Sequence, residues 1–493
     1  MLRNSIIPTL VILILIVCNA CNKENIFNGD SPNLNFSTDT LTFDTVFTTV
    51  GSATRFIKIY NPNQEDVIID QIFLEEGNNS FFNLNINGLS ANEGQDIKVL
   101  GRDSIYIFAE VTVDPDQDVS ASPFVIDENL VIKFKNESYN VVLEAWGQNA
   151  IYFSGKDAQG ALPRVFTCDL GEYIFDDAKP YVIHGVLVID SCDIVLPAGT
   201  DIYVHGGIAI NDLGVYPDGR ILIGPNAKIT ARGTAEEPVT IQGDRLEMEF
   251  DNIPGQWVGL IFLAGSTGNS FTHTQIRNPV FGILADSATS LVLNQVEIAN
   301  TSSSGLVGIH SNINANNCLI YNNGGNSLQL THGGNYNFTN CTIYNDFNDQ
   351  SALYINNYQC VDPDCSNPPL INEMRVSFIN SILTGEDGDE ISFDDWNAGE
   401  QDELFQYYFD HCMLKVDEIL LPEQYPTLLE DSPETEAIMS NDSIFLDRIN
   451  YDLRHDTMSV AINKGTAVFQ LPIDIRGLPR DAVFDLGCYE FQE

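Results

Sequence analysis

Five residues, Cys318-Leu319-Ile320-Tyr321-Asn322, recur with few changes as Cys341-Thr342-Ile343-Tyr344-Asn345. Two further copies precede them, Thr274-Gln275-Ile276-Arg277-Asn278 and Val296-Glu297-Ile298-Ala299-Asn300. The central isoleucines are 22, 22 and 23 residues apart, so one structural unit recurs at a nearly constant period. Because side chains alternate along a strand, the first and third positions of each copy are expected to point inward. One strand cannot bury such a face alone, but stacked coils form a continuous core.

The asparagine that closes each copy supports the same interpretation. Asparagine tolerates the left-handed backbone conformation, and stacked amides can hydrogen-bond along the axis. The sequence therefore predicts a ladder of Asn278, Asn300, Asn322 and Asn345. A leucine-rich repeat has a similar period, but its Leu-x-x-Leu-x-Leu frame is missing here. We expect an all-β chain with a right-handed parallel β-helix over residues 181–420, and with inserted loops near 346–375 and 385–405.

Short strands separated by turn residues come before the repeat. Residues 56–60, 67–74 and 105–111 are examples, and turn signals recur about every dozen residues. The pattern predicts a β-sandwich over residues 36–150. The strand order, with Asn61-Pro62 and the exit Ala145-Trp146-Gly147, resembles immunoglobulin-like domains, which implies a sandwich of that kind. Residues 151–180 are then expected to form a connector or cap, and residues 421–493 a C-terminal capping region.

The amino end carries an export signal. Arg3 precedes an apolar run, residues 6–17, that is too short to span a bilayer and is typical of a signal peptide over residues 1–20. A small residue, Ala20, stands before Cys21, as in a bacterial lipobox, so Cys21 is the expected lipidation site and residues 21–35 a polar tether. A secretory peptide cleaved without lipidation is the alternative.

Several motifs resemble a group of Bacteroidota β-helix lipoproteins. They include Gly255-Gln256-Trp257-Val258-Gly259-Leu260 and a C-terminal block, Asp485-Leu486-Gly487-Cys488-Tyr489-Glu490, that is similar to the end of bacterial surface β-helix proteins. Cys488 stands where that family commonly has Ala. The resemblance covers nearly the whole mature chain and implies an outer-membrane, lipid-anchored, surface-exposed protein. It implies little about activity.

The balance of charges limits the partners. Against 69 acidic residues stand 23 basic ones, which gives a net charge of −46. Such a surface repels nucleic acid and anionic membranes, so no nucleic-acid partner is expected. It also repels anionic polysaccharides unless divalent cations bridge the two.

The repeat strands present a candidate ligand surface of Arg277, Tyr321 and Tyr344. The two tyrosine rings are expected to lie one coil apart, as a platform for sugar rings would. The alternative is an aromatic ladder that only stabilises the sheet. His310 and His332 are also 22 residues apart, with Asp286 in the preceding coil. They could act as acid and base or bind a metal, although loop histidines commonly have neither role.

Cysteines and carboxylates give two further hypotheses. Cys360 and Cys365 flank a short loop and could form a disulfide in an exported protein, and Cys168 and Cys192 are a second possible pair. Eight carboxylates between residues 387 and 403 could hold Ca²⁺, but their spacing matches no known calcium loop, so a solvated acidic loop is the simpler interpretation. Otherwise no cofactor is expected.

Two functions remain open at this point. A non-catalytic surface protein that binds glycan or proteins, or has a structural role, agrees with the tether and with the lack of a convincing active site. A polysaccharide lyase or glycoside hydrolase is the alternative, because many parallel β-helices are such enzymes. A hydrolase needs paired carboxylates, whereas the aligned rows offer a single carboxylate, Glu297.

Overall fold

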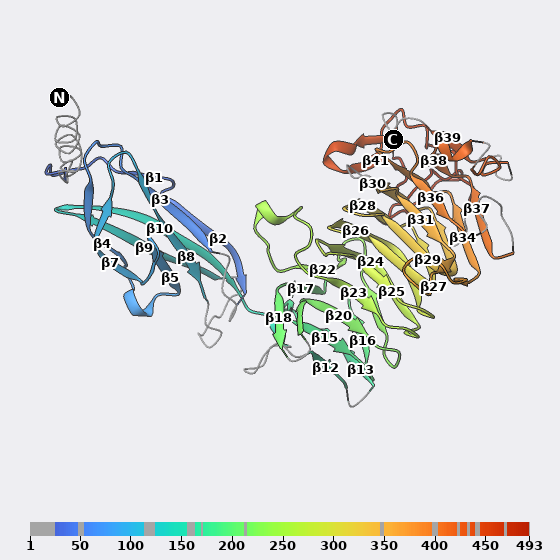
Figure 1. The fold of residues 1–493 in the computed structure, drawn as a ribbon, viewed down its shortest axis with the longest axis horizontal. Coiled ribbons are helices and arrows are strands. Elements are labelled where there is room, and N and C mark those ends of the chain that lie inside the picture. Colours follow the sequence, from blue (N-terminus) through green and yellow to red (C-terminus); the bar gives the residue numbers. More distant parts are fainter. Residues whose placement is uncertain are drawn as a thin grey trace, which may run out of the picture. The chain divides into compact units, whose positions relative to one another are not determined.

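The computed structural model describes residues 25–47, 54–112, 124–154, 163–168, 171–211, 214–345, 350–396, 403–421, 424–430, 434–438, 444–467 and 471–492. The chain divides into two compact units, Met1–Asn149 and Ala150–Glu493 (Figure 1). The expected signal peptide and Cys21 lie outside the described residues. Within the described ranges, no helix is both long and apolar enough to cross a membrane.

The first unit is a β-sandwich of two five-stranded sheets. One sheet has the order β1 (Asn35–Phe36), β3 (Arg55–Tyr60), β8 (Ser104–Val111), β5 (Phe82–Ile86) and β6 (Leu89–Ser90). The other has the order β2 (Thr40–Phe47), β10 (Glu137–Gln148), β9 (Phe124–Phe134), β4 (Val67–Leu74) and β7 (Glu93–Val99). Alternating apolar residues such as Ile57, Ile59 and Ile107 are fully buried between the sheets. A 3₁₀ helix, η1 (Gly77–Asn79), follows β4.

The second unit is a parallel β-helix whose strands form one 25-stranded sheet that wraps around the core. Successive coils stack strand on strand (Figure 1). The parallel pairings run in three ladders, which define three faces. Face 1 consists of β11 (Ile151–Ser154), β14 (Tyr181–His184), β17 (Asp201–His205), β22 (Val239–Gly243), the later parts of β24 (Asn269–Arg277) and β26 (Ser290–Thr301), β28 (Leu319–Asn323), β30 (Thr342–Asn345), β35 (Ile382–Gly385), β38 (Met413–Lys415) and β39 (Glu436–Ile438).

The other two faces complete each coil. Face 2 consists of β12 (Arg164–Phe166), β15 (Val186–Ile189), β20 (Arg220–Ile223), β23 (Gly259–Phe262), β25 (Ile283–Ala285), the first residues of β27 (Leu306–Asn316) and β29 (Leu328–Thr339), β31 (Leu353–Asn356) and β36 (Ile391–Asp394). Face 3 consists of β13 (Glu172–Ile174), β16 (Asp193–Leu196), β21 (Ile229–Arg232), the first parts of β24 and β26, the later parts of β27 and β29, β34 (Met374–Ile379) and β37 (Phe405–Asp410).

Short hairpins and 3₁₀ helices lie outside this stack of strands. They are the hairpins β18 (Ile208–Asn211) with β19 (Gly214–Pro217), β32 (Tyr358–Gln359) with β33 (Leu370–Ile371) and β40 (Phe445–Asp447) with β41 (Asp452–His455), and the 3₁₀ helices η2 (Met248–Phe250), η3 (Glu418–Leu420) and η4 (Arg448–Asn450).

The β-helix extends further than the sequence predicted. Residues 151–180 are not a connector, because β11, β12 and β13 pair in parallel with β14, β15 and β16 and so form the first coil. The two expected inserted loops contain regular strands of the stack, β31 and β36, which pair with each other. The loops between these strands lengthen the coils and hide their period in the sequence.

The predicted core and most of the predicted ladder are confirmed. Ile276, Ile298, Ile320 and Ile343 pair in register and are buried. The amide of Asn300 donates to Asn278 Oδ1 at 3.1 Å, and that of Asn322 donates to Asn300 Oδ1 at 2.6 Å. Asn278, Asn300 and Asn322 all have left-handed backbone. The fourth predicted member, Asn345, differs, because its side-chain amide donates to the Gln350 carbonyl. The hydroxyl of Tyr451 donates to Asn322 at 2.9 Å and ends the ladder.

The C-terminal region lies along face 1 instead of only capping one end. Ile444, Phe445, Leu453 and Leu486 form a second core with Leu319, Tyr344, Ile382 and Met413 of the face. A buried polar network fixes this segment: Arg480 pairs with Glu490 at 2.8 Å and donates to Asn317 Oδ1 at 2.7 Å. Face 1 is therefore covered along β28, β30, β35 and β38.

Candidate functional site

Face 3 presents a polar surface along several coils. In β27 the sequence alternates the inward residues Ile313 and Ala315 with the outward residues Asn312, Asn314 and Asn316. Alternation places every second side chain on the outer side of the sheet. Asn312 and Asn314 are exposed, while Ile313 and Ala315 are fully buried. This strand therefore offers a row of amides to solvent.

The parallel register stacks these amides from coil to coil. Asn312 pairs with Asn335, and Asn314 pairs with Asn337. The Asn337 amide donates to Asn314 Oδ1 at 3.0 Å. One coil earlier, the Asn316 amide donates to Asn294 Oδ1 at 2.9 Å. These internal bonds orient the amides and leave further donors and acceptors at the surface.

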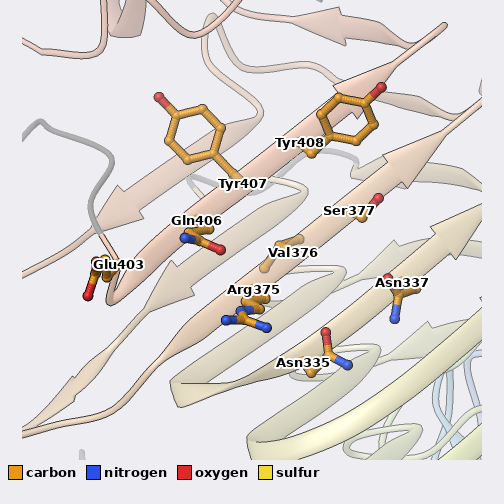
Figure 2. Close-up of a pocket in the computed structure, with 9 residues that line it drawn as sticks. All are labelled: Asn335, Asn337, Arg375, Val376, Ser377, Glu403, Gln406, Tyr407 and Tyr408. Atoms are coloured by element: carbon orange, nitrogen blue, oxygen red, sulfur yellow. The ribbon is translucent and has the colours of Figure 1, made fainter. Parts of the chain in front are cut away.

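The polar surface ends in an open groove of about 590 Å³ over β29, β34 and β37 (Figure 2). Arg375 pairs with Asn335 on one side and Gln406 on the other, and Ser377 pairs with Asn337 and Tyr408 in the same way. The groove is lined by Asn335, Asn337, Arg375, Val376, Ser377, Glu403, Gln406, Tyr407 and Tyr408.

The groove combines hydrogen-bonding groups with one exposed ring. Tyr408 is 48% exposed, whereas its neighbour Tyr407 is 7% exposed and belongs to the core. In Figure 2 the Tyr408 ring lies beside Ser377, and Gln406 lies beside Arg375. Arg375 forms an ion pair with Glu373, which largely balances its charge. Amides, a hydroxyl and an apolar ring face are the groups that bind the hydroxyls and C–H faces of sugars.

The carboxylates at the groove bear on whether it could cleave a glycan. Glycosidases need two carboxylates that flank the bond to be cleaved. Among the described residues that line the groove, Glu403 is the one carboxylate. Glu400 and Asp402 lie outside the described residues.

The expected ligand surface on face 1 is wrong for Tyr321 and Tyr344. Tyr344 is fully buried, with Phe445 packed edge-on at 5.7 Å. Tyr321 is half-buried, and the ring of Tyr451 lies 5.5 Å away. The tyrosines do pair one coil apart, but the C-terminal region covers them. Their outward-facing side chains therefore contact the C-terminal region of the same chain instead of a ligand.

The third residue of that surface, Arg277, is also engaged. It pairs with Glu297 at 2.8 Å, and the Tyr321 hydroxyl donates to the same carboxylate at 2.9 Å. Burial, followed by the charge of Glu297, raises the pKa of Tyr321 well above its usual value. Glu297 also lines a small polar cavity of about 220 Å³, together with Arg476 and Tyr489 among other residues.

The two candidate histidines are neighbours in the structure. His310 Nδ1 lies 3.2 Å from the His332 carbonyl oxygen, and burial, with the nearby His310, lowers the pKa of His332. Asp286 instead accepts a hydrogen bond from the backbone of Ser287 at 2.6 Å. The described residues contain no cluster of three or more His, Cys, Asp or Glu side chains that could hold a metal ion. Both histidines have left-handed backbone, which indicates a corner of the coil.

The acidic segment is not a solvated loop where the structure describes it. Glu390 accepts from the backbone of Ala352 and Asp387, each at 2.8 Å. Asp389 accepts from the backbone N–H groups of Asp417 and Ile419 at the start of η3. Two more bonds, from Tyr354 to Asp394 at 2.7 Å and from Tyr425 to Asp395 at 2.6 Å, tie neighbouring strands and loops. Because these carboxylates serve different partners, they do not converge on one ion.

The cysteines fall into two groups. Cys360 is bonded to Cys365, and Cys168 is bonded to Cys192. Cys318, Cys341, Cys412 and Cys488 are free and buried. Cys318, Cys341 and Cys412 pack inside the β-helix as small apolar side chains, and Cys488 packs in the second core with the C-terminal region.

The sequence does contain a pattern that indicates a polar outer side for face 3, but it lies outside the five-residue copies that define the repeat. The asparagines of β27 and β29 alternate with apolar residues over residues 312–316 and 335–338. Such alternation marks a strand with one solvated side. The contribution of Arg375, Gln406 and Tyr408 could not be found in this way, because loops of unequal length separate their strands from the earlier coils.

Comparison with known proteins supports the fold and leaves the function open. A family model described as a right-handed β-helix region matches residues 242–368. With the continuous parallel sheet, this match places the second unit among the right-handed parallel β-helices. No curated protein matches the chain.

Two similar solved structures each cover about a quarter of the chain. A family 123 glycoside hydrolase from Clostridium perfringens is 7% identical over 24% of this chain and 30% of its own, with a TM-score of 0.18. A protein of unknown function from Porphyromonas gingivalis is 13% identical over 26% of this chain and 61% of its own, also with a TM-score of 0.18. Likenesses this weak carry no argument about activity.

Proposed function

We propose that this protein is a surface lipoprotein that binds an extracellular, uncharged glycan along face 3 without cleaving it. The observation that carries the proposal is the row of outward amides that ends in the groove with the exposed Tyr408 ring. A polysaccharide is itself a repeating chain. A stack of coils that presents the same groups at a regular spacing therefore suits it.

The charge of the protein favours an uncharged glycan. The net charge of −46 opposes the approach of uronate or sulfate groups. Inside the groove, Arg375 is balanced by Glu373, and Glu403 adds a negative charge.

Retention of the protein on neutral polysaccharides tests the proposal. The chain from Asn22 onward is run in native gels that contain laminarin, galactomannan or xyloglucan, and reducing ends and unsaturated products are followed in parallel. We expect slower migration in at least one gel without new ends. Cleavage of any polymer would instead favour the alternative, a lyase or glycosidase, and would direct attention to Glu403 and Arg375.

The lipid anchor is a separate part of the proposal. Lipidation at Cys21 would hold the protein at the outer membrane, with residues 22–35 as a tether. Cells that express the wild type or Cys21→Ser are labelled with a radioactive fatty acid and then fractionated. We expect label and membrane association for the wild type alone, whereas equal labelling of both proteins would exclude Cys21.

A further inference from the structure

The sandwich carries a cluster of exposed aromatic rings on the outer side of the β3–β8 pair. Phe56, Tyr60, Tyr106 and Phe108 are 51%, 40%, 40% and 38% exposed. Phe56 pairs directly with Phe108 across the two strands. The inward neighbours Ile57, Ile59 and Ile107 fill the core, so the sandwich does not need the outer rings for its own packing.

These rings form one continuous surface. The Tyr106 and Phe108 rings are nearly parallel, with an interplanar angle of 12° and centroids 5.9 Å apart. Phe56 lies edge-on to both, at 5.3 Å from Tyr106 and 6.2 Å from Phe108. Lys58 lies between two rings, 5.1 Å from the centroid of Tyr60 and 4.9 Å from that of Tyr106. A contiguous apolar patch on an otherwise highly charged protein marks an interaction surface.

Polar groups border the rings on both sides. On β5, the exposed Asn83 pairs with Glu110, and Asn85 pairs with Phe108. On β1, Asn35 pairs with Tyr60 and lines an open groove of about 740 Å³ that also includes Tyr139. The rings therefore lie between amides and a groove, so that an extended ligand can cross them.

Charge selects the kind of partner. A second copy of this chain also carries a net charge of −46, so like charges oppose self-association. The same charge opposes anionic partners, and the ammonium group of Lys58 already lies over the Tyr60 and Tyr106 rings, where a cationic partner would otherwise bind. An uncharged partner with apolar C–H faces and many hydroxyls satisfies both conditions, and a neutral polysaccharide has this chemistry.

We infer that the outer surface of β3 and β8, formed by Phe56, Lys58, Tyr60, Tyr106 and Phe108, is a second glycan-binding surface that stacks sugar rings of a neutral polysaccharide. The inference goes beyond the function proposed for face 3. It rests on different residues in a different unit of the chain and holds whether or not the groove binds.

Native gels with laminarin, galactomannan or xyloglucan test this surface separately from the groove. The chain from Asn22 onward is compared with Tyr106→Ala/Phe108→Ala, with the groove variant Tyr408→Ala and with all three changes together. The matched control is Phe73→Ala, because Lys133 lies 4.7 Å from the Phe73 ring on the outer side of the other sheet. Circular dichroism checks that each variant is folded.

We expect the double variant to bind roughly tenfold more weakly, because stacking on two rings is lost. Phe73→Ala should bind like the wild type. Wild-type binding by the double variant, or no retardation of the wild type by any of the three polymers, would overturn the inference. If Tyr408→Ala alone binds normally and the double variant does not, then the proposed function of the groove fails while this surface stands.

Discussion

Asn380 joins the C-terminal region to the β-helix through both ends of its amide. The side chain is fully buried, accepts from the Thr466 backbone at 2.9 Å and donates to the Thr466 carbonyl at 2.7 Å. Its backbone has a φ of 51°, a conformation that asparagine tolerates better than most residues. Asn317 and Asn340 share this backbone and this burial, and they also bond to the C-terminal region.

Replacing Asn380 tests this connection. Asn380→Ala should lower the free energy of unfolding by about 2–4 kcal/mol, because the N–H and carbonyl groups of Thr466 lose their partner and alanine must adopt left-handed backbone. Asn463→Ala is the matched control, since Asn463 has a φ of 57° but is exposed; it should cost about 1 kcal/mol. Urea unfolding measures both, and equal losses would mean that the amide contacts contribute nothing.

Glu390 makes stability depend on pH. Burial raises the pKa of this carboxyl group to about 7, and the charge of Asp387 adds to this, although backbone hydrogen bonds and Lys415 oppose the change. A carboxyl group with a raised pKa in the folded state favours folding at low pH. Between its ordinary pKa of 4.5 and about 7, the unfolded chain ionises first, so stability falls as the pH rises and levels off above 7.

The variant Glu390→Gln isolates this effect. The difference in unfolding free energy, wild type minus variant, should decrease by on the order of 2 kcal/mol between pH 4.5 and pH 8. Urea unfolding at several pH values measures it. A difference that stays constant with pH would show that Glu390 ionises normally in the folded protein.

At the scale of elements, periodicity predicted the strands but not what covers them. The spacing of Ile276, Ile298 and Ile320 was enough to place β24, β26 and β28 in register, since a stacked core requires it. Whether the outer side of face 1 meets solvent or protein depends on contacts with residues more than 100 positions away, such as that between Tyr344 and Phe445. Strand alternation alone cannot distinguish these two cases.

The ion pair of Arg480 and Glu490 tests how firmly the C-terminal region is attached. Arg480→Ala leaves a buried carboxylate without its partner and should lower stability by about 3–5 kcal/mol. The control Arg454→Ala breaks a largely exposed pair with Asp452 and should cost less than about 1 kcal/mol. Thermal unfolding and limited proteolysis within residues 439–470 measure the result. Equal behaviour of the two variants would contradict this role for Arg480.

At the scale of the whole molecule, charge and architecture point to the same kind of partner. The β-helix turns a short repeat into a long surface, and the covering of face 1 leaves face 3 as the polar surface that ends in a groove. The acidic surface then selects against anionic polymers. The fold could be predicted because it depends on a repeat, whereas the groove could not, because it depends on where β34 and β37 enter the stack.

The most direct test of glycan binding on face 3 is native gel migration of Tyr408→Ala in the neutral polysaccharide that slows the wild type most. Tyr216→Ala, which removes a half-buried ring on the β18–β19 hairpin, is the matched control. We predict roughly tenfold weaker binding for Tyr408→Ala and unchanged binding for Tyr216→Ala. Unchanged binding by Tyr408→Ala would contradict the assignment of face 3 as the glycan-binding surface.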